Sequence, residues 1–183
     1  MDRKLVERAQ SGDREAYEAL ARASADRLYS TAYRIARDGD IAEDAVQQTL
    51  VQIWRELPSL RDPDRYEAWT YRLVVRFCGR DTRRARTAGV REIRVDDTAP
   101  SVVDAIADAD LRDQLDRALA TLSVDHRTVV VLHHYSGLPL TEIAEILGVP
   151  YGTVGSRLHH AHRALRAAIN AGDRSTALEG QLA

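Results

Sequence analysis

Apolar residues recur every three or four positions along most of the chain, which is the spacing of one face of an α-helix. Asp13 is placed to cap a long helix, and Asp40 with Glu43 has the spacing of a capping box at the start of the next helix. Pro58 then ends that helix. The first half of the chain therefore predicts four helices, with apolar stripes at 5–9, 16–35, 45–57 and 69–77.

The periodic pattern fades after residue 87 and returns near residue 111. Acidic residues outnumber basic ones in between, and Gly89 and Pro100 interrupt the segment. Such a stretch is typical of a linker. We therefore expect an all-α protein made of two small helical domains. The predicted divisions are a first domain at 1–87, an acidic flexible linker at 88–110, a second domain at 111–172 and a frayed tail at 173–183.

The second domain ends in a pattern typical of a helix-turn-helix. Thr141 is placed to cap a first helix, Gly148 permits the positive φ of a tight turn, and Pro150 suits the entry to a second helix. A plain helical hairpin is the alternative. Earlier in this domain, the apolar segment 129–135 is expected to form a buried helix, because no nearby segment could pair with it as a strand. The exposed face of the second helix would carry Tyr151, Thr153, Ser156, Arg157 and His160, which could reach base edges and phosphates in a major groove.

A row of arginines marks the last helix of the first domain. The row lies at three- and four-residue steps, so its members share one helix face, opposite an apolar stripe that includes Leu73 and Phe77. Such a face attracts phosphates. The ordinary alternative is a solvated arginine face on a packed helix. The row consists of Arg72, Arg76, Arg80, Arg83 and Arg84.

Composition excludes several classes of protein. The net charge is -2 and the only cysteine is Cys78, whose apolar neighbours favour a buried, unreactive thiol. The N-terminus lacks the apolar core of a signal peptide, and no apolar run reaches the ~20 residues that span a bilayer. We therefore expect a cytoplasmic protein without membrane insertion. The histidines at 133–134 and 159–162 lack a partnering carboxylate or cysteine, so we expect no metal, no cofactor and no enzymatic activity.

Taken in their order along the chain, these patterns resemble extracytoplasmic-function (ECF) sigma factors of bacterial RNA polymerase. Segment 41–50 is similar to the helix that docks on the clamp coiled coil of the largest polymerase subunit. Segment 69–84 is similar to the part that melts and reads the minus-ten element, and 138–165 to the part that reads the minus-thirty-five element. The resemblance covers the chain from Leu5 to about Ile169.

The resemblance implies a role for each segment. Trp69 joins the five arginines as a minus-ten residue, and the five exposed residues of 151–160 become minus-thirty-five residues. The implied partners are promoter DNA, the clamp coiled coil and the flap of the second-largest subunit, and many family members are also held by an anti-sigma protein. Polymerase docking falls on Glu43, Asp44, Gln47, Gln48, Ile53 and Trp54.

This chain departs from the family pattern at several positions. Arg76 stands where the family often has asparagine, which helps to capture a flipped promoter base. Gly155 replaces a frequent lysine, Gln48 an acidic residue and Ser123 a frequent proline. The alternative function is a helix-turn-helix regulator that acts without docking on polymerase. That alternative leaves the first domain unexplained.

Overall fold

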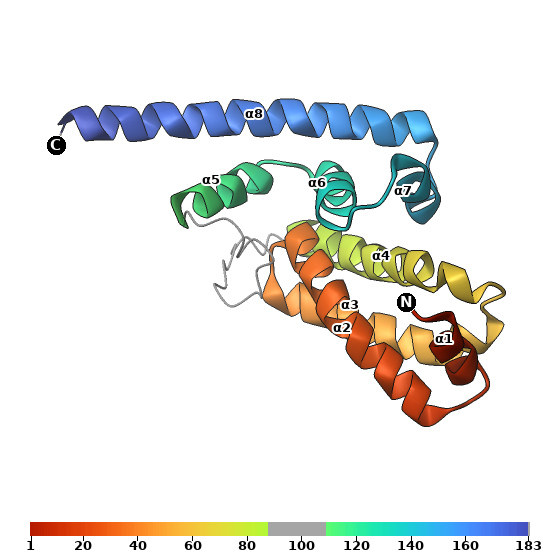
Figure 1. The fold of residues 1–183 in the computed structure, drawn as a ribbon. Coiled ribbons are helices and arrows are strands. Elements are labelled where there is room, and N and C mark those ends of the chain that lie inside the picture. The colour runs from red at the N-terminus through yellow and green to blue at the C-terminus, as the bar shows by residue number, and fades with distance from the viewer. Residues whose placement is uncertain (88–108, 183) are drawn as a thin grey trace.

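The computed structural model describes residues 1–87 and 109–182, which form helices joined by short connections and contain no strand. Figure 1 shows two groups of helices, one stacked on the other. The first group comprises α1 (Arg3–Gln10), α2 (Arg14–Ala36), α3 (Gly39–Glu56) and α4 (Tyr66–Thr87), with short 3₁₀ turns η1 (Leu57–Ser59) and η2 (Pro63–Arg65). The second comprises α5 (Ala109–Ala120), α6 (Val124–Val130), the π-helical turn η4 (Val131–Tyr135), α7 (Leu140–Leu147) and α8 (Tyr151–Leu182). The all-α class with two helical domains is confirmed, whereas the predicted acidic linker lies almost wholly outside the described residues.

Aspartates begin the first three helices. Asp2, Asp13 and Asp38 each accept a hydrogen bond from a backbone N–H of the first turn. The predicted cap at Asp13 is confirmed, but the capping box of Asp40 and Glu43 is wrong. Helix α2 ends at a left-handed residue, Arg37 (φ 58°), so the chain turns early and Asp38 becomes the cap of α3. Each such cap stabilises its helix by about 1 kcal/mol.

The core of the N-terminal domain lies between α2, α3 and α4. Leu20, Leu28 and Ile53 are almost completely buried there. One polar pair, the Ser24 hydroxyl and the Tyr66 phenol 3.2 Å apart, satisfies its own hydrogen bonds inside this core. This packing holds α4 rigidly, with one face inward and the other outward.

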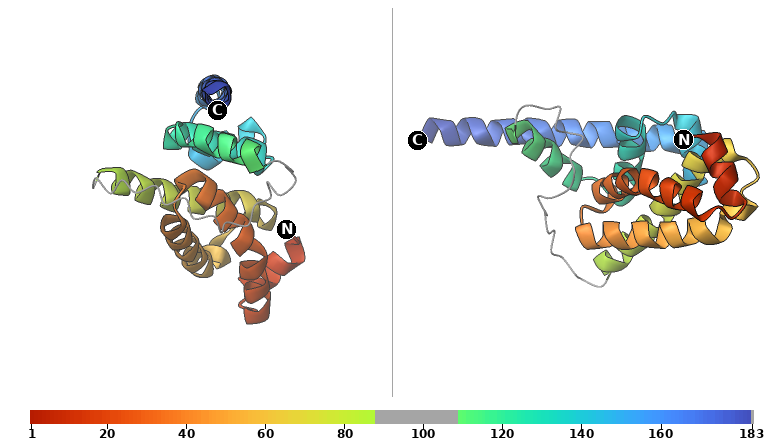
Figure 2. Two further views of the ribbon diagram at one scale, coloured as in Figure 1. Left: turned by 90° about the vertical axis from the view of Figure 1, so that its left-hand side faces the viewer. Right: turned by 60° about the horizontal axis from the view of Figure 1, so that its bottom comes forward.

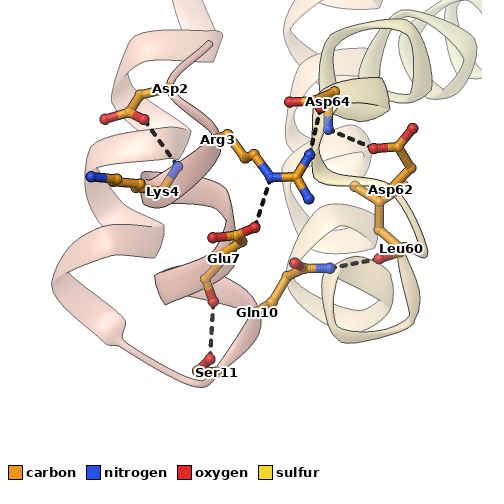
Figure 3. Close-up of polar contacts among 9 residues, drawn as sticks. All are labelled: Asp2, Arg3, Lys4, Glu7, Gln10, Ser11, Leu60, Asp62 and Asp64. Carbon is orange, nitrogen blue, oxygen red and sulfur yellow. Dashed lines mark hydrogen bonds and ion pairs between the residues drawn. The ribbon is translucent and has the colours of Figure 1, made fainter.

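Helix α1 fixes the loop that leads into α4 (Figure 3). The Arg3 guanidinium contacts Glu7 at 2.8 Å and Asp64 of η2 at 2.5 Å. The Gln10 amide donates to the Leu60 carbonyl at 2.7 Å. The starting point of α4 is therefore tied to the N-terminus of the chain.

The C-terminal domain contains the predicted helix-turn-helix, α7 and α8. Gly148 has φ 65°, as the turn requires, and the next amide, Val149, donates to the Ala144 carbonyl. The predicted cap at Thr141 is wrong, because α7 already begins at Leu140 after an extended Pro139, and Thr141 therefore lies inside the helix.

The tail predicted at 173–183 lies within a helix in its described part. Helix α8 continues to Leu182, and Figure 2 shows it projecting beyond α5 as one long helix. Strong helix formers recur between 173 and 182, and a glycine costs a helix only about 1 kcal/mol. The sequence signal of Gly172 was therefore too weak to stop the helix.

The two domains are packed against each other. The C-terminal end of α2 contacts α6 and η4, and α4 contacts α6 and α7 (Figure 1). The buried guanidinium of Arg127 in α6 donates to the Ile35 carbonyl of α2 at 2.7 Å. Arg34 of α2 lies over the Tyr135 ring, 4.1 Å from its centroid. These contacts fix where the helix-turn-helix lies relative to α4.

Candidate nucleic-acid interface

Helix α4 presents the predicted arginine row on its outer face. All five arginines are exposed, while Leu73, Val74 and Phe77 on the opposite side are buried. Trp69 is half-buried and meets the Tyr66 ring edge-on, with centroids 6.2 Å apart. The amphipathic pattern therefore places one cationic face on a helix whose other face is part of the core.

Most of these arginines already contact a polar partner. Arg80 lies 2.8 Å from Asp81 and donates to the Gln48 amide oxygen at 2.5 Å. The Arg80 guanidinium lowers the pKa of Asp81 below its usual range. Arg72 donates to the backbone carbonyl of Glu145 at 3.1 Å, and Arg83 pairs with Asp125. The last two contacts cross from α4 to the other domain.

The first turns of α8 carry the predicted recognition residues. Tyr151, Ser156 and His160 are exposed, and Thr153 and Arg157 are half-buried. The Arg157 guanidinium lies 3.5 Å from Asp125. The opposite side of the helix is held by the buried residues Val154, Leu158 and Ala161. One side of α8 therefore carries exposed polar side chains while the other side packs into the core. A recognition helix that enters a major groove has the same two sides.

The outer face of α3 carries most of the predicted docking residues. Glu43, Asp44, Gln47 and Trp54 are exposed, whereas Gln48 is half-buried beside Arg80. Trp54 is 56% exposed and packs edge-on against the Tyr17 ring at 4.6 Å between centroids. Trp is enriched among the residues that carry most of the binding energy of protein interfaces, so the exposed Trp54 ring is suited to burial against a partner protein.

One residue of the predicted docking set is buried, and one exposed apolar residue of α3 lies outside that set. Ile53 is only 1% exposed and belongs to the core, because it lies on the inner side of α3. Val51 is 50% exposed and lies one helical turn before Trp54 on the outer side. Val51 lies three residues before Trp54, so the helical period places both on the same side of α3 and could have predicted that Val51 is exposed. The apolar character of Ile53 alone did not reveal which side of the helix it faces.

The histidines do not gather into a metal centre. Among the residues that the structure describes, no group of three His, Cys, Asp or Glu could hold a metal ion. His134 and His162 do face each other, with their Nε2 atoms 2.7 Å apart. Burial, together with nearby His133, lowers the pKa of His134. Cys78 is buried, and this burial raises the pKa of its thiol to about 12.

Comparison with known proteins gives a class for this arrangement. The chain matches the family model for sigma-70 region 2 over residues 20–87 and that for sigma-70 region 4 over residues 112–165. These two regions, in this order, define a sigma factor. They coincide with the helices that carry the arginine row and with the helix-turn-helix.

Individual relatives narrow the class. The chain is 35% identical over 170 residues to the ECF RNA polymerase sigma factor SigL of Mycobacterium tuberculosis, which covers 85% of this chain and 92% of the relative. It is 27% identical over 180 residues to the ECF RNA polymerase sigma factor SigW of Bacillus subtilis, covering 91% of this chain and 95% of the relative. The chain belongs to the ECF RNA polymerase sigma factor family.

Solved structures share the fold. CnrH, in complex with the cytosolic domain of CnrY, has a TM-score of 0.68 and 28% identity, covering 93% of this chain and 97% of that chain. The sigma factor RpoE of Bartonella quintana, in complex with the anti-sigma factor NepR, has a TM-score of 0.66 at 24% identity, covering 84% and 96%. Within 1–87 and 109–182, no helix is long and apolar enough to span a bilayer.

Proposed function

We propose that this chain binds core RNA polymerase and directs it to promoters by recognising a minus-ten and a minus-thirty-five element. The observation that carries this proposal is the presence, in one chain of the ECF family, of an exposed arginine face on α4 and a helix-turn-helix with an open polar strip on α8. A regulator that only binds duplex DNA needs the second feature and leaves the first unused.

Each surface has a proposed role. The arginines of α4, with Trp69, bind the phosphates and unstacked bases of the melted minus-ten element, since cationic and aromatic side chains bind single strands in this way. The exposed residues of α8, with Thr153 and Arg157, read the minus-thirty-five duplex. The docking surface on α3 consists of Glu43, Asp44, Gln47, Gln48, Val51 and Trp54.

The proposal includes three further points. Residues 1–87 act as the docking and minus-ten domain, 88–110 as a linker and 111–172 as the minus-thirty-five domain. The chain performs no covalent chemistry, so the polymerase supplies all catalysis. It works in the cytoplasm with the polymerase, and the solved relatives bound to regulatory chains support an anti-sigma protein as a further partner.

In vitro transcription tests the proposal directly. The purified chain is added to bacterial core polymerase on a DNA fragment that carries the region upstream of its own gene, and core binding is measured on the same sample by co-elution. A discrete transcript that needs both components supports a sigma factor. Absence of core binding overturns the proposal and leaves the regulator that acts without polymerase.

Two variants separate the surfaces. Trp54→Ala should weaken co-elution with core polymerase about tenfold or more, because a large apolar side chain loses its burial in the complex. Tyr151→Ala should leave co-elution unchanged and weaken binding to the minus-thirty-five duplex. Both side chains are exposed aromatics, 56% and 57%, so each variant serves as the control for the other.

A further inference from the structure

An aspartate interrupts the arginine row of α4. Asp81 follows Arg80 directly and is half-buried, on the side of α4 that contacts α3. A carboxylate beside cations that are assigned to DNA repels the phosphates that those cations attract. Charge alone therefore gives Asp81 an unfavourable effect on the proposed function.

Asp81 holds the guanidinium group of Arg80 by two parallel hydrogen bonds. Arg80 Nε donates to Oδ1 of Asp81 at 2.8 Å, and Arg80 Nη2 donates to Oδ2 at 3.2 Å. A guanidinium group that binds a carboxylate through two of its nitrogens has a fixed plane as well as a fixed position. The carboxylate therefore sets the direction in which Arg80 points.

Two further side chains restrain Arg80 in the same position. The Gln48 amide oxygen of α3 accepts from Arg80 Nη2 at 2.5 Å, and the Gln48 amide nitrogen donates to Oδ2 of Asp81 at 3.4 Å. The Phe77 ring lies one helical turn earlier, with its centroid 5.3 Å from the guanidinium carbon of Arg80. Groups from two helices thus restrain Arg80, although its side chain is 57% exposed.

The same contacts leave one end of the guanidinium group open. An arginine has five N–H donors, and the hydrogen bonds to Asp81 and Gln48 occupy three of them. Both remaining donors belong to Nη1, which has no acceptor within residues 1–87 and 109–182. Nη1 can therefore donate to a phosphate oxygen while Nε and Nη2 stay bound to their present partners.

Arg84 provides a comparison within the row. It lies one helical turn after Arg80 and is exposed, and it forms no hydrogen bond or ion pair with a residue in the described part of the chain. The two arginines carry the same charge on the same face of α4. They differ in that the orientation of Arg80 is fixed by neighbouring side chains.

We infer that Asp81 is a positioning residue for DNA binding, which together with Gln48 orients Arg80 so that Nη1 meets a phosphate of the melted minus-ten strand. The inference rests on the proposed function, which assigns this strand to α4. A side chain that is already ordered loses less rotamer freedom on binding, so an oriented arginine binds phosphate more tightly than a free one. This gain exceeds the repulsion between Asp81 and the phosphate, because solvent and salt screen charges at an exposed surface.

The sign of one substitution tests the inference. Asp81→Asn keeps the shape of the side chain and removes its charge. A carboxylate that merely repelled DNA would make this variant bind the minus-ten strand more tightly. A carboxylate that orients Arg80 makes it bind about threefold to tenfold more weakly, the range expected when one long side chain must be ordered on binding. Asp26→Asn, at an exposed position of α2, is the matched control because it makes the same change of net charge.

A second substitution tests whether Asp81 acts through Arg80. Arg80→Gln removes the proposed phosphate contact and should weaken binding more than Arg84→Gln does. In the Arg80→Gln background, Asp81→Asn should no longer weaken binding, because the residue that it positions is gone. The slope of the logarithm of the binding constant against the logarithm of the salt concentration should become shallower by about 0.7 in Arg80→Gln, the value for one phosphate contact on a single strand.

Binding is measured with the full chain in complex with core polymerase, at a core concentration that saturates every variant. The probe is a fluorescent single-stranded oligonucleotide that carries the non-template strand across the minus-ten element mapped by in vitro transcription, and core polymerase alone is the blank. Anisotropy gives the affinity. Tighter binding by Asp81→Asn, or an equal loss in the wild-type and Arg80→Gln backgrounds, overturns the inference.

Failure of the proposed function gives a different result. Wild-type chain that neither binds core polymerase nor supports transcription overturns that function. The restraint on Arg80 is tested without polymerase or DNA, by nuclear magnetic resonance of the arginine Nε–H groups in the free chain. The Arg80 proton should exchange with water more slowly than that of Arg84, and Asp81→Asn should remove the difference. Equal exchange rates in the wild type overturn the positioning role.

Discussion

The two domains support their DNA surfaces in different ways. In the N-terminal domain, the arginine row lies on one straight helix, and the core beneath it includes Leu28 and Ile53 on two other long helices. In the C-terminal domain, the recognition strip depends on a turn in which Gly148 has φ 65°. The first surface thus depends on side-chain charge and the second on backbone geometry. Substitutions that act on one of these properties should therefore affect the two domains unequally.

The largest expected effect on stability comes from truncating a buried side chain in the small core of the C-terminal domain. Ile143 is fully buried there, and Ile143→Ala should lower the free energy of unfolding by about 2–5 kcal/mol. Leu28→Ala should cost a similar amount in the N-terminal domain. Denaturant unfolding gives the stability, and hydrogen exchange shows which domain opens. Val51→Ala, at an exposed site, is the control and should change stability little.

Ile143→Ala also tests whether the domains serve separate functions. It should abolish binding to the minus-thirty-five duplex while leaving co-elution with core polymerase in place, because α3 does not depend on the α7–α8 packing. Equal loss of both activities would show that the two domains fold as one unit and would contradict the comparison.

The next effect concerns the buried contact that joins the domains. Arg127→Met leaves the Ile35 carbonyl without its charged donor, and an unsatisfied buried acceptor costs about 1–3 kcal/mol. Unfolding should become less cooperative, with the C-terminal domain melting first. Arg163→Met, at an exposed position of α8, is the control. If both variants unfold in a single transition and differ from the wild type only in its midpoint, Arg127 does not couple the unfolding of the two domains.

A pair of glycines tests the dependence on backbone geometry. Gly148→Ala should destabilise the protein by about 1–2 kcal/mol, since a side chain at positive φ is strained. Gly155→Ala, beyond the first turn of α8, should stabilise it by about 0.5–1 kcal/mol. An added methyl group meets nothing within 4 Å at either site, so the opposite signs report only backbone conformation. Thermal unfolding of the two variants measures the difference.

The sequence predicted the helices and the exposed arginine row because both follow from local period. It placed the cap of α3 at Asp40 instead of Asp38, since the left-handed Arg37 is not encoded in any turn signal that a sequence shows. The sequence did not predict the ion pairs of Asp125 with Arg83 and of Glu145 with Arg65. In each pair the two residues lie in different domains, 42 and 80 residues apart in sequence. Contacts between domains depend on how the domains pack, which local patterns do not specify.

The smallest expected effect on stability comes from the pair formed by His134 and His162 in the C-terminal domain. The N-terminal domain has no such pair, because all six histidines of the chain lie between His126 and His162. Burial lowers the pKa of His134, so the folded state binds a proton less readily than the unfolded state. Stability should therefore fall as the pH drops below about 6.5, the ordinary histidine pKa.

The Nε2 atoms of His134 and His162 can share one proton at 2.7 Å but repel when both rings are protonated. His134→Gln should flatten the decline in stability between about pH 7 and 5, whereas His159→Gln, at an exposed position of the same domain, should retain it. Urea unfolding at a series of pH values measures both slopes. If the two variants decline in parallel with the wild type, the acid sensitivity of the C-terminal domain comes from groups other than this pair.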